Sequence, residues 1–251
     1  MISVTIIGSG NVGTHLAKAL SMAPDVTLKQ LYSRRPDGFS SEFTKAEIIH
    51  DLHQLEEADV YLLAVSDDAV KDVSQQLPFS GRLVAHTSGT LPLETIDRKN
   101  RRGVWYPLQT FSRAKAIDFQ TIPICIETEQ PSDAEILTNV ARALSQHVYT
   151  LKAEQRQALH VAAVFACNFT NHLYAQAARI CDDHQLDFDM LKPLIRETAD
   201  KVMTMAPIDA QTGPAKRHDD VTLAAHRRFL GNGPATELYD ILTQSIQREQ
   251  L

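Results

Sequence analysis

Three glycines near the start of the chain, Gly8, Gly10 and Gly13, have the spacing of a phosphate-binding turn. An apolar run over residues 2–7 precedes them and an amphipathic segment over residues 11–22 follows, which predicts a strand, a tight turn and a helix. In such a turn the first glycine makes the bend, the second lets the backbone approach a pyrophosphate, and the third lets helix and strand pack closely. The free N–H groups at the helix N-terminus would hold the pyrophosphate. We therefore expect dinucleotide contacts from Gly8, Ser9, Gly10, Asn11, Val12 and Gly13.

The end of the second expected strand indicates which dinucleotide binds. An NAD site carries an acidic residue about 20 residues after the glycines, where it binds the ribose hydroxyls. Ser33 occupies that position here, and Arg34 and Arg35 follow it. A hydroxyl and two guanidinium groups can bind a 2′-phosphate, which a carboxylate would repel. The pattern predicts NADP rather than NAD, unless the two arginines only solvate the end of the strand.

A polar turn follows the strand expected at 59–65. Open α/β sheets bind their ligands at the carboxyl ends of their strands, so we expect Val65, Ser66 and Asp67 to contact the cofactor. Ser66 or Asp67 could instead only cap the helix that comes next.

A histidine ends the strand expected at 82–87. An imidazole at this edge of the sheet, beside a nicotinamide, could donate a proton, which makes His86 a candidate acid. A buried histidine bonded to the backbone explains the same residue equally well. Ser88 lies in the turn that follows, where we expect it to contact the substrate.

Polar residues also interrupt a long apolar helix expected at 154–182. His160 and Asn168 are eight positions apart and are expected to share a face, with His172 one turn further. Such groups need partners, which either a ligand cavity between domains or a helix–helix hydrogen-bond network would supply. We expect no metal site, because the two histidines lack i, i+4 spacing and no carboxylate or cysteine joins them.

A loop in the helical half concentrates positive charge. Lys216 and Arg217 follow Thr212-Gly213-Pro214-Ala215, and Asp219 is expected to cap the next helix. The two cations could bind a carboxylate or phosphate of the substrate, or they could lie on a solvated surface.

The elements around these residues predict two domains. Strand and helix patterns alternate over residues 1–151, which is typical of a doubly wound, mainly parallel sheet of the Rossmann type. Only helical patterns fill residues 152–251. The expected fold class is therefore α/β plus all-α, and the site residues lie in both parts. The strands are expected at 2–8, 26–32, 59–65, 82–87, 103–106, 121–127 and 147–151, with a short one around 48–50.

Composition excludes several classes of protein. The chain has 251 residues, 43% of them hydrophobic and 22% charged, with a formal net charge of −6, which argues against a nucleic-acid partner. Its three cysteines show no C-x-x-C spacing, which favours a reducing, cytoplasmic setting. The first residues read as a strand rather than a signal peptide. The longest apolar stretch, 158–167, is too short to span a membrane.

Five ordered motifs resemble one bacterial family, in which a Rossmann-like NADP-binding domain precedes a helical domain of unknown function numbered 2520. The family is similar in architecture to pyrroline-5-carboxylate reductase, ketopantoate reductase and the β-hydroxyacid dehydrogenases. The motifs are Gly8-x-Gly10-x-x-Gly13, His86-Thr87-Ser88-Gly89, Pro107-Leu108-Gln109-Thr110-Phe111, His160 through Phe169, and Thr212-Gly213-Pro214.

This resemblance implies a site between the domains and a homodimer formed through the helical domain. It also exposes a departure. The latter two of these enzyme families present a Lys-x-x-x-Asn pair on the first helix of the second domain. Asn168 matches the asparagine, but Val164 stands where the lysine belongs. His160 or His86 would have to replace that lysine.

These residues favour an NADPH-dependent reductase that moves hydride to a C=O or C=N bond of a small, anionic metabolite. His160 or His86 would donate the proton and Asn168 would orient the substrate, while Lys216 and Arg217 would bind its acid group. The missing lysine leaves room for a different class, a non-catalytic NADP-binding sensor. A dehydrogenase that uses a deazaflavin is the third hypothesis.

Overall fold

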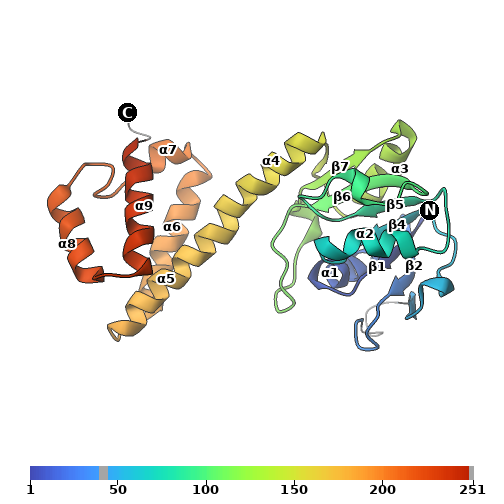
Figure 1. The fold of residues 1–251 in the computed structure, drawn as a ribbon, viewed down its shortest axis with the longest axis horizontal. Helices are drawn as coiled ribbons and strands as arrows, with labels where there is room; N and C mark the ends of the chain where they lie inside the picture. The colour runs from blue at the N-terminus through green and yellow to red at the C-terminus, as the bar shows by residue number, and fades with distance from the viewer. Residues whose placement is uncertain (40–44, 249–251) are drawn as a thin grey trace. The chain divides into compact units, whose positions relative to one another are not determined.

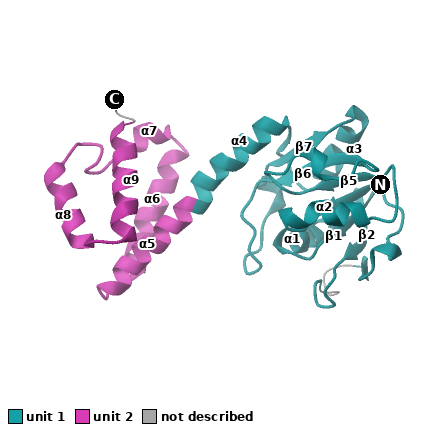
Figure 2. Ribbon diagram, in the orientation of Figure 1, with its two compact units in different colours: residues 1–168 teal, residues 169–251 magenta. Residues whose placement is uncertain are grey.

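The structure, a computed structural model, describes residues 1–39 and 45–248. Its internal contacts divide the chain into two compact units, residues 1–168 and residues 169–251 (Figure 2). The boundary expected from the sequence, after residue 151, falls one helix earlier. The difference is the helix α4 (Ala153–Ala163), whose Arg156 is fully buried and bonded to the sheet unit.

Unit 1 contains an eight-stranded sheet in the order β3-β2-β1-β4-β5-β6-β7-β8 (Figure 1). All neighbouring strands are parallel except β6 and β7, which are antiparallel. The first six positions are the strand order of the doubly wound nucleotide-binding fold, so this prediction is confirmed. The strands are β1 (Ile2–Ile7), β2 (Val26–Tyr32), β3 (Glu47–Ile49), β4 (Val60–Leu63), β5 (Leu83–His86), β6 (Arg101–Pro107), β7 (Ile124–Thr128) and β8 (Val148–Thr150).

Apolar residues explain why these strands lie in the middle of the unit. All four residues of β4 are buried, as expected for a parallel strand covered on both faces. One core cluster joins the sheet to α1 (Asn11–Leu20) and α3 (Pro131–Arg142), and a second joins it to α2 (Asp67–Gln76). These layers fix the carboxyl ends of the strands, where the expected site residues are found.

The described residues of unit 2 form helices and the loops between them, without a β-strand. The long helix expected at 154–182 is present but is not a continuous α-helix, since a π-helical segment, Val164–Phe169, separates α4 from α5. Val161, in the apolar first half of this helix, is 56% exposed in the single chain. The α-helices of unit 2 are α5 (Thr170–Asp183), α6 (Lys192–Val202), α7 (Pro207–Ala210), α8 (Asp220–Leu230) and α9 (Pro234–Arg248), whereas α4 belongs to unit 1.

Local signals account for the ends of these helices. Pro234 lies in the first turn of α9, where its missing N–H costs no hydrogen bond. Asp219 caps α8 by accepting a hydrogen bond from the Thr222 amide, as predicted. Within the described parts of the chain, none of the helices combines the length and apolar character needed to span a bilayer.

Candidate functional site

The three glycines of the first turn meet three different requirements. Gly8 has a φ of +117°, and a Cβ there would lie 2.4 Å from the Ala64 carbonyl oxygen. A Cβ at Gly13 would lie 1.9 Å from the Gly8 carbonyl oxygen, so strand and helix can only pack this closely without it. At Gly10 the nearest atom is 3.8 Å away, and the protein itself leaves this position open. The packing of the fold therefore requires glycine at positions 8 and 13. At position 10 the reason for glycine is a ligand that approaches the backbone.

A cleft of about 590 Å³ opens beside this turn, at the carboxyl ends of β1, β2 and β4. This volume lies within the range of small-molecule sites. Ten of the twelve residues expected to bind the cofactor line it. Asp67 and Gly13 do not, and Gly13 lies on the buried face of α1. The ten are Gly8, Ser9, Gly10, Asn11, Val12, Ser33, Arg34, Arg35, Val65 and Ser66.

Hydrogen bonds organise the end of the cleft that follows β2. The buried hydroxyls of Ser9 and Ser33 lie 2.8 Å apart, and the Arg35 amide donates to the Ser33 hydroxyl at 3.1 Å. A Cβ at Gly38 would lie 2.0 Å from the Ser33 hydroxyl oxygen, so the backbone closes tightly over the serine pair. The Arg34 and Arg35 side chains stay exposed. Among the described residues, neither arginine forms an ion pair.

A side-chain hydrogen bond joins the turn after β4 to the turn after β5. Asp67 accepts a hydrogen bond from the Ser88 hydroxyl at 2.9 Å, and that hydroxyl accepts from the amides of Thr90 and Leu91. One donor and two acceptor positions exhaust a serine hydroxyl, so Ser88 has no capacity left for a substrate. Its substrate contact stays a prediction that this geometry does not support. Ser66 precedes α2 without a side-chain capping bond, and its hydroxyl is not used by the helix.

His86 is inaccessible to solvent, and its Nδ1 accepts a hydrogen bond from the Ser88 amide at 3.2 Å. Burial, together with the positive charge of Arg156, lowers the pKa of His86 from its ordinary value of 6.5 to about 4. The ring is therefore neutral at physiological pH. This is the backbone-bonded alternative that the sequence left open, and the geometry does not support His86 as the proton donor.

His160 lies in a different environment, partly exposed on α4. Its Nδ1 is 3.0 Å from the Tyr106 hydroxyl, and the two rings meet edge to face with centroids 5.8 Å apart. Burial raises the pKa of Tyr106 to about 12, so the phenol keeps its proton and can donate it to Nδ1. In that tautomer Nε2 carries the imidazole proton. Among the described residues Nε2 has no hydrogen-bond partner.

Gly89 makes room for this pair. A Cβ at position 89 would lie 2.5 Å from His160 Nδ1 and 2.7 Å from Tyr106 Cζ. The turn after β5, the strand β6 and the helix α4 therefore meet at one point. The sequence motif contained Gly89, but its reason is visible only in the structure.

Arg156 anchors α4 to the sheet, and sequence reasoning missed it. Its guanidinium donates to the carbonyls of Gly89 and Leu91 at 2.8 Å each, and to the Glu127 carboxylate at 2.9 Å. The side chain is fully buried, with its charge balanced by that carboxylate. Since Arg156 precedes His160 by one helical turn, this anchor fixes the height and rotation of the histidine. The i, i+4 spacing of the two residues was the available signal.

The π-helical segment changes the phase between His160 and Asn168. In a regular α-helix, two side chains eight residues apart point in directions that differ by about 80° around the helix axis. His160 and Asn168 would then not share a face. A π-turn accommodates one extra residue, so the separation acts like seven residues, about 20° from a shared face. The segment thus brings Asn168, which is exposed, into line with His160. Its catalytic role stays a prediction.

The remaining expected residues lie in unit 2. Lys216 is half-buried and Arg217 is exposed in the loop before α8. Their substrate contact stays a prediction. Over residues 1–39 and 45–248, no group of three or more histidine, cysteine or acidic side chains is arranged to hold a metal ion.

Comparisons with known proteins show one family match and several structures of similar fold. A family model described as a domain of unknown function (DUF2520) matches residues 122–246. A Bacteroides fragilis protein, provisionally named an NADP oxidoreductase, is 39% identical over 98% of both chains, with a TM-score of 0.87. A search of curated proteins returned no match.

Two more distant structures share the fold. Pyrroline carboxylate reductase from Plasmodium falciparum, solved with NADP bound, is 14% identical over 98% of both chains, with a TM-score of 0.62. An imine reductase from a Pseudomonas species is 18% identical, with a TM-score of 0.67 over 99% of this chain and 94% of that one.

Proposed function

This chain belongs to the family defined by domain of unknown function 2520, and we propose that it is an NADP-dependent oxidoreductase. The observation that carries the proposal is the 590 Å³ cleft, which joins an open Gly10 to the Ser33-Arg34-Arg35 turn. The name of the Bacteroides fragilis relative supports the same cofactor and the same class of reaction.

The cleft fits the cofactor at both of its charged ends. The N-terminus of α1 offers backbone N–H groups for a pyrophosphate. Gly10, at the start of this helix, has no side chain that would keep the pyrophosphate from the backbone. Ser33 and the exposed Arg34 and Arg35 would bind the 2′-phosphate by charge-assisted hydrogen bonds. Val65 and Ser66 would line the path between these ends. When bound, the cofactor supplies the hydride.

We propose His160 as the general acid for a C=O or C=N bond of a small, anionic metabolite. To act as the acid, His160 must carry both ring protons: Nδ1–H then donates to the Tyr106 hydroxyl oxygen, and Nε2 gives its proton to the substrate and is left as a neutral imidazole nitrogen. Arg156 and Gly89 fix the position of the ring. Asn168 would orient the substrate from the same helical face. Lys216 and Arg217 would bind the acid group of the substrate, as the sequence predicts.

The test combines binding with turnover. We expect NADPH to bind more tightly than NADH, and we expect NADPH oxidation with some members of a panel of keto acids and imines. His160→Ala should lower kcat by about 10²- to 10⁴-fold and leave the Kd for NADPH nearly unchanged. Binding without any oxidation would instead favour an NADP sensor. A preference for NADH, or for a deazaflavin in a thermal-shift screen, would contradict the assigned cofactor.

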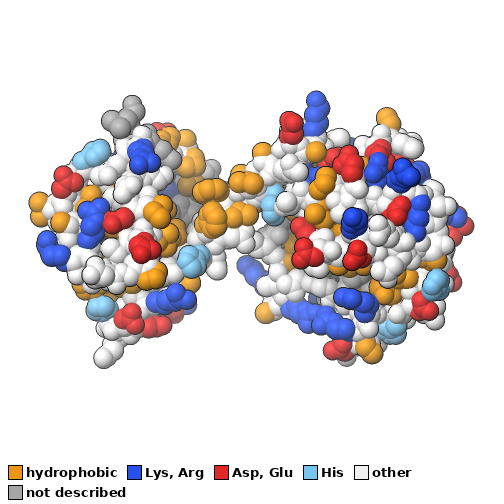
Figure 3. Space-filling view, in the orientation of Figure 1, with side chains coloured by type: hydrophobic (Ala, Val, Ile, Leu, Met, Phe, Trp, Pro, Cys, Tyr) orange, Lys and Arg blue, Asp and Glu red, His pale blue; other side chains and the backbone are white. Residues whose placement is uncertain are grey.

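We also propose that the chain forms a homodimer through its helical unit. Unit 2 exposes many large apolar side chains (Figure 3), among them Met190 at 71%, Leu194 at 62% and Ile241 at 65%. Exposed apolar surface of this kind is typical of protein interfaces. Light scattering should give twice the chain mass, and Leu194→Glu with Ile241→Glu should give the monomer. Met22→Glu, at a position 72% exposed in unit 1, is the matched control.

A cytoplasmic location is the last part of this proposal. All three cysteines are free thiols, and Cys125 and Cys181 are buried. Unpaired cysteines persist most readily in a reducing compartment.

A further inference from the structure

The connection between β6 and β7 lies against the glycine-rich turn. We call residues 108–118 the strap. The Asn11 side-chain amide donates to the Phe111 carbonyl at 3.0 Å, and His15 Nε2 lies 2.9 Å from the Ser112 carbonyl oxygen. The rings of His15 and Phe111 also pack, with centroids 5.5 Å apart. The strap is therefore fixed to the first turns of α1, which hold the pyrophosphate in the proposed function.

The strap brings one cation, Arg113, to the backbone of the glycine-rich turn, although Arg113 lines the neighbouring cavity rather than the nucleotide cleft itself. Arg113 Nη2 donates to the Ser9 carbonyl at 3.4 Å, and the Ser9 hydroxyl is 2.8 Å from that of Ser33. One serine residue thus separates the guanidinium from the hydroxyl that we assign to the 2′-phosphate. Thr14 reaches the same carbonyl from α1, with its Oγ1 3.5 Å away.

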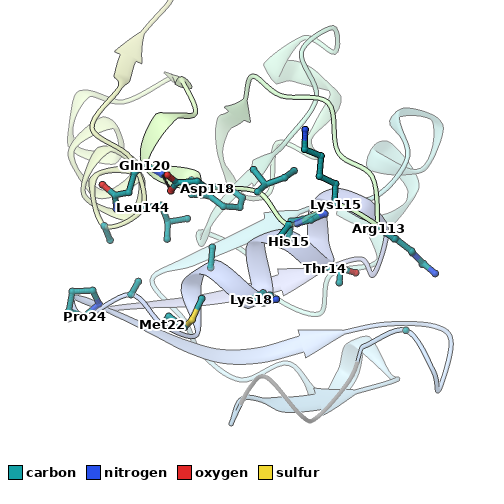
Figure 4. Close-up of a pocket in the computed structure, with 17 residues that line it drawn as sticks. Thr14, His15, Lys18, Met22, Pro24, Arg113, Lys115, Asp118, Gln120 and Leu144 are labelled. Atoms are coloured by element: carbon teal, nitrogen blue, oxygen red, sulfur yellow. Dashed lines mark hydrogen bonds between the residues drawn. The ribbon is translucent and has the colours of Figure 1, made fainter. Parts of the chain in front are cut away.

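The surroundings of Arg113 leave its charge available. Its side chain is exposed, and no ion pair involves it among the described residues. Arg113, Thr14 and Lys115 line a cavity of about 620 Å³ beside α1 and the strap. The side chains of Arg113 and Lys115 leave the strap in different directions (Figure 4). Of these two strap cations, Arg113 is the one that is hydrogen-bonded to the glycine-rich turn.

We propose that Arg113 is a third cation of the 2′-phosphate subsite and joins Arg34 and Arg35 from a distant part of the sequence. This inference rests on the proposed NADP function. The hydrogen bond to the Ser9 carbonyl is long and goes to a neutral acceptor, so it is weak. A phosphate dianion offers three charged oxygens that a guanidinium binds in bidentate fashion, so a small rotation of the side chain exchanges a weak bond for stronger ones.

The experiment compares two nucleotides that differ only in the 2′-phosphate. The Kd values of NADPH and NADH are measured by fluorescence titration for the wild type, Arg113→Ala, Arg113→Lys and Lys115→Ala. Arg113→Ala should weaken NADPH binding by about 10- to 100-fold and change NADH binding by less than about twofold. Arg113→Lys should fall between, because an ammonium keeps the charge but not the planar fork. Lys115→Ala, two residues further along the strap, should match the wild type.

The outcomes separate this inference from the proposed function. If Arg113→Ala weakened the binding of NADPH and NADH by the same factor, Arg113 would only anchor the strap. If NADPH binding were unchanged, Arg113 would make no contact with the 2′-phosphate. Either result overturns the inference while a wild-type preference for NADPH preserves the proposed function. A wild type that prefers NADH would overturn both. Melting temperatures of the four proteins verify that each is folded.

Discussion

The substitution Gly89→Ala tests whether the position of His160 matters for turnover. The backbone at Gly89 lies outside the left-handed region, so alanine suits its conformation. The added Cβ, however, would lie 2.5 Å from His160 Nδ1 and 2.7 Å from Tyr106 Cζ. These separations are shorter than van der Waals contact, so both rings must move. The substitution displaces the proposed acid without removing it.

The structure sets the expected magnitudes. Displacement breaks the 3.0 Å contact between Tyr106 and His160, with a net cost of about 0.5–1.5 kcal/mol for a hydrogen bond. Overpacking adds about 1–3 kcal/mol, and the sum is smaller than the usual stability of a domain, about 5–15 kcal/mol. The protein should therefore remain folded. Turnover should fall by about 10²- to 10⁴-fold, the contribution of a positioned general acid.

Three measurements check this prediction. Urea unfolding gives the stability loss, the NMR signals of the His160 ring report its displacement, and NADPH absorbance gives kcat with a substrate from the panel. In a His160→Ala background, Gly89→Ala should change kcat little, since the displaced group is already gone. Gly233→Ala, with no atom within 4 Å of the added Cβ, is the control. Wild-type kcat in a Gly89→Ala protein whose His160 signals have moved would refute the assigned role of His160.

Three further predictions concern the fold and the cleft. Gly10→Ala should leave stability nearly unchanged but weaken NADPH binding, because the nearest protein atom is 3.8 Å from the added Cβ. Gly13→Ala should destabilise the unit, because its Cβ would lie 1.9 Å from a carbonyl oxygen. Urea unfolding and nucleotide titration measure the two effects, and equal losses of stability in the two variants would contradict our assignment. Arg156→Met should cost about 3–5 kcal/mol of unfolding free energy, since it leaves a partly buried carboxylate and two carbonyls without their donor. His86 binds a proton more weakly when folded, at a pKa of about 4 against an ordinary 6.5, so stability should be complete above about pH 6.5 and fall towards pH 4 by about 3 kcal/mol in all. Urea unfolding at several pH values should show this slope in the wild type, and an equal slope in His86→Gln would assign it to other groups.

The sequence by itself predicted most of the fold. Periodicity located β1, β4 and β5, because a short, continuous apolar run between turn residues is typical of a buried parallel strand. The short strand around residue 48 was also predicted and is confirmed as β3. Local chemistry marked the first turn of α9 and the cap of α8. The π-helical segment was not predicted, since its residues fit an ordinary α-helix equally well.

The candidate site divides in the same way. The cleft around Gly10 and the turn at Ser33 could be predicted because a dinucleotide imposes fixed spacing on adjacent residues of one βαβ unit. The choice between His86 and His160 as the acid could not be predicted from the sequence. Both are histidines, and they differ only in burial and in the residues around them. Burial beside a buried arginine keeps His86 neutral.

Short-range pattern and steric rules thus determined which segments form strands and helices, and where a pyrophosphate can approach the backbone. Only the tertiary structure decided which distant residues meet. Arg156 reaches the turn after β5, Tyr106 reaches His160, and Arg113 reaches Ser9. Each pair is far apart in the chain, and its contact depends on the packing of whole layers, which no local pattern encodes.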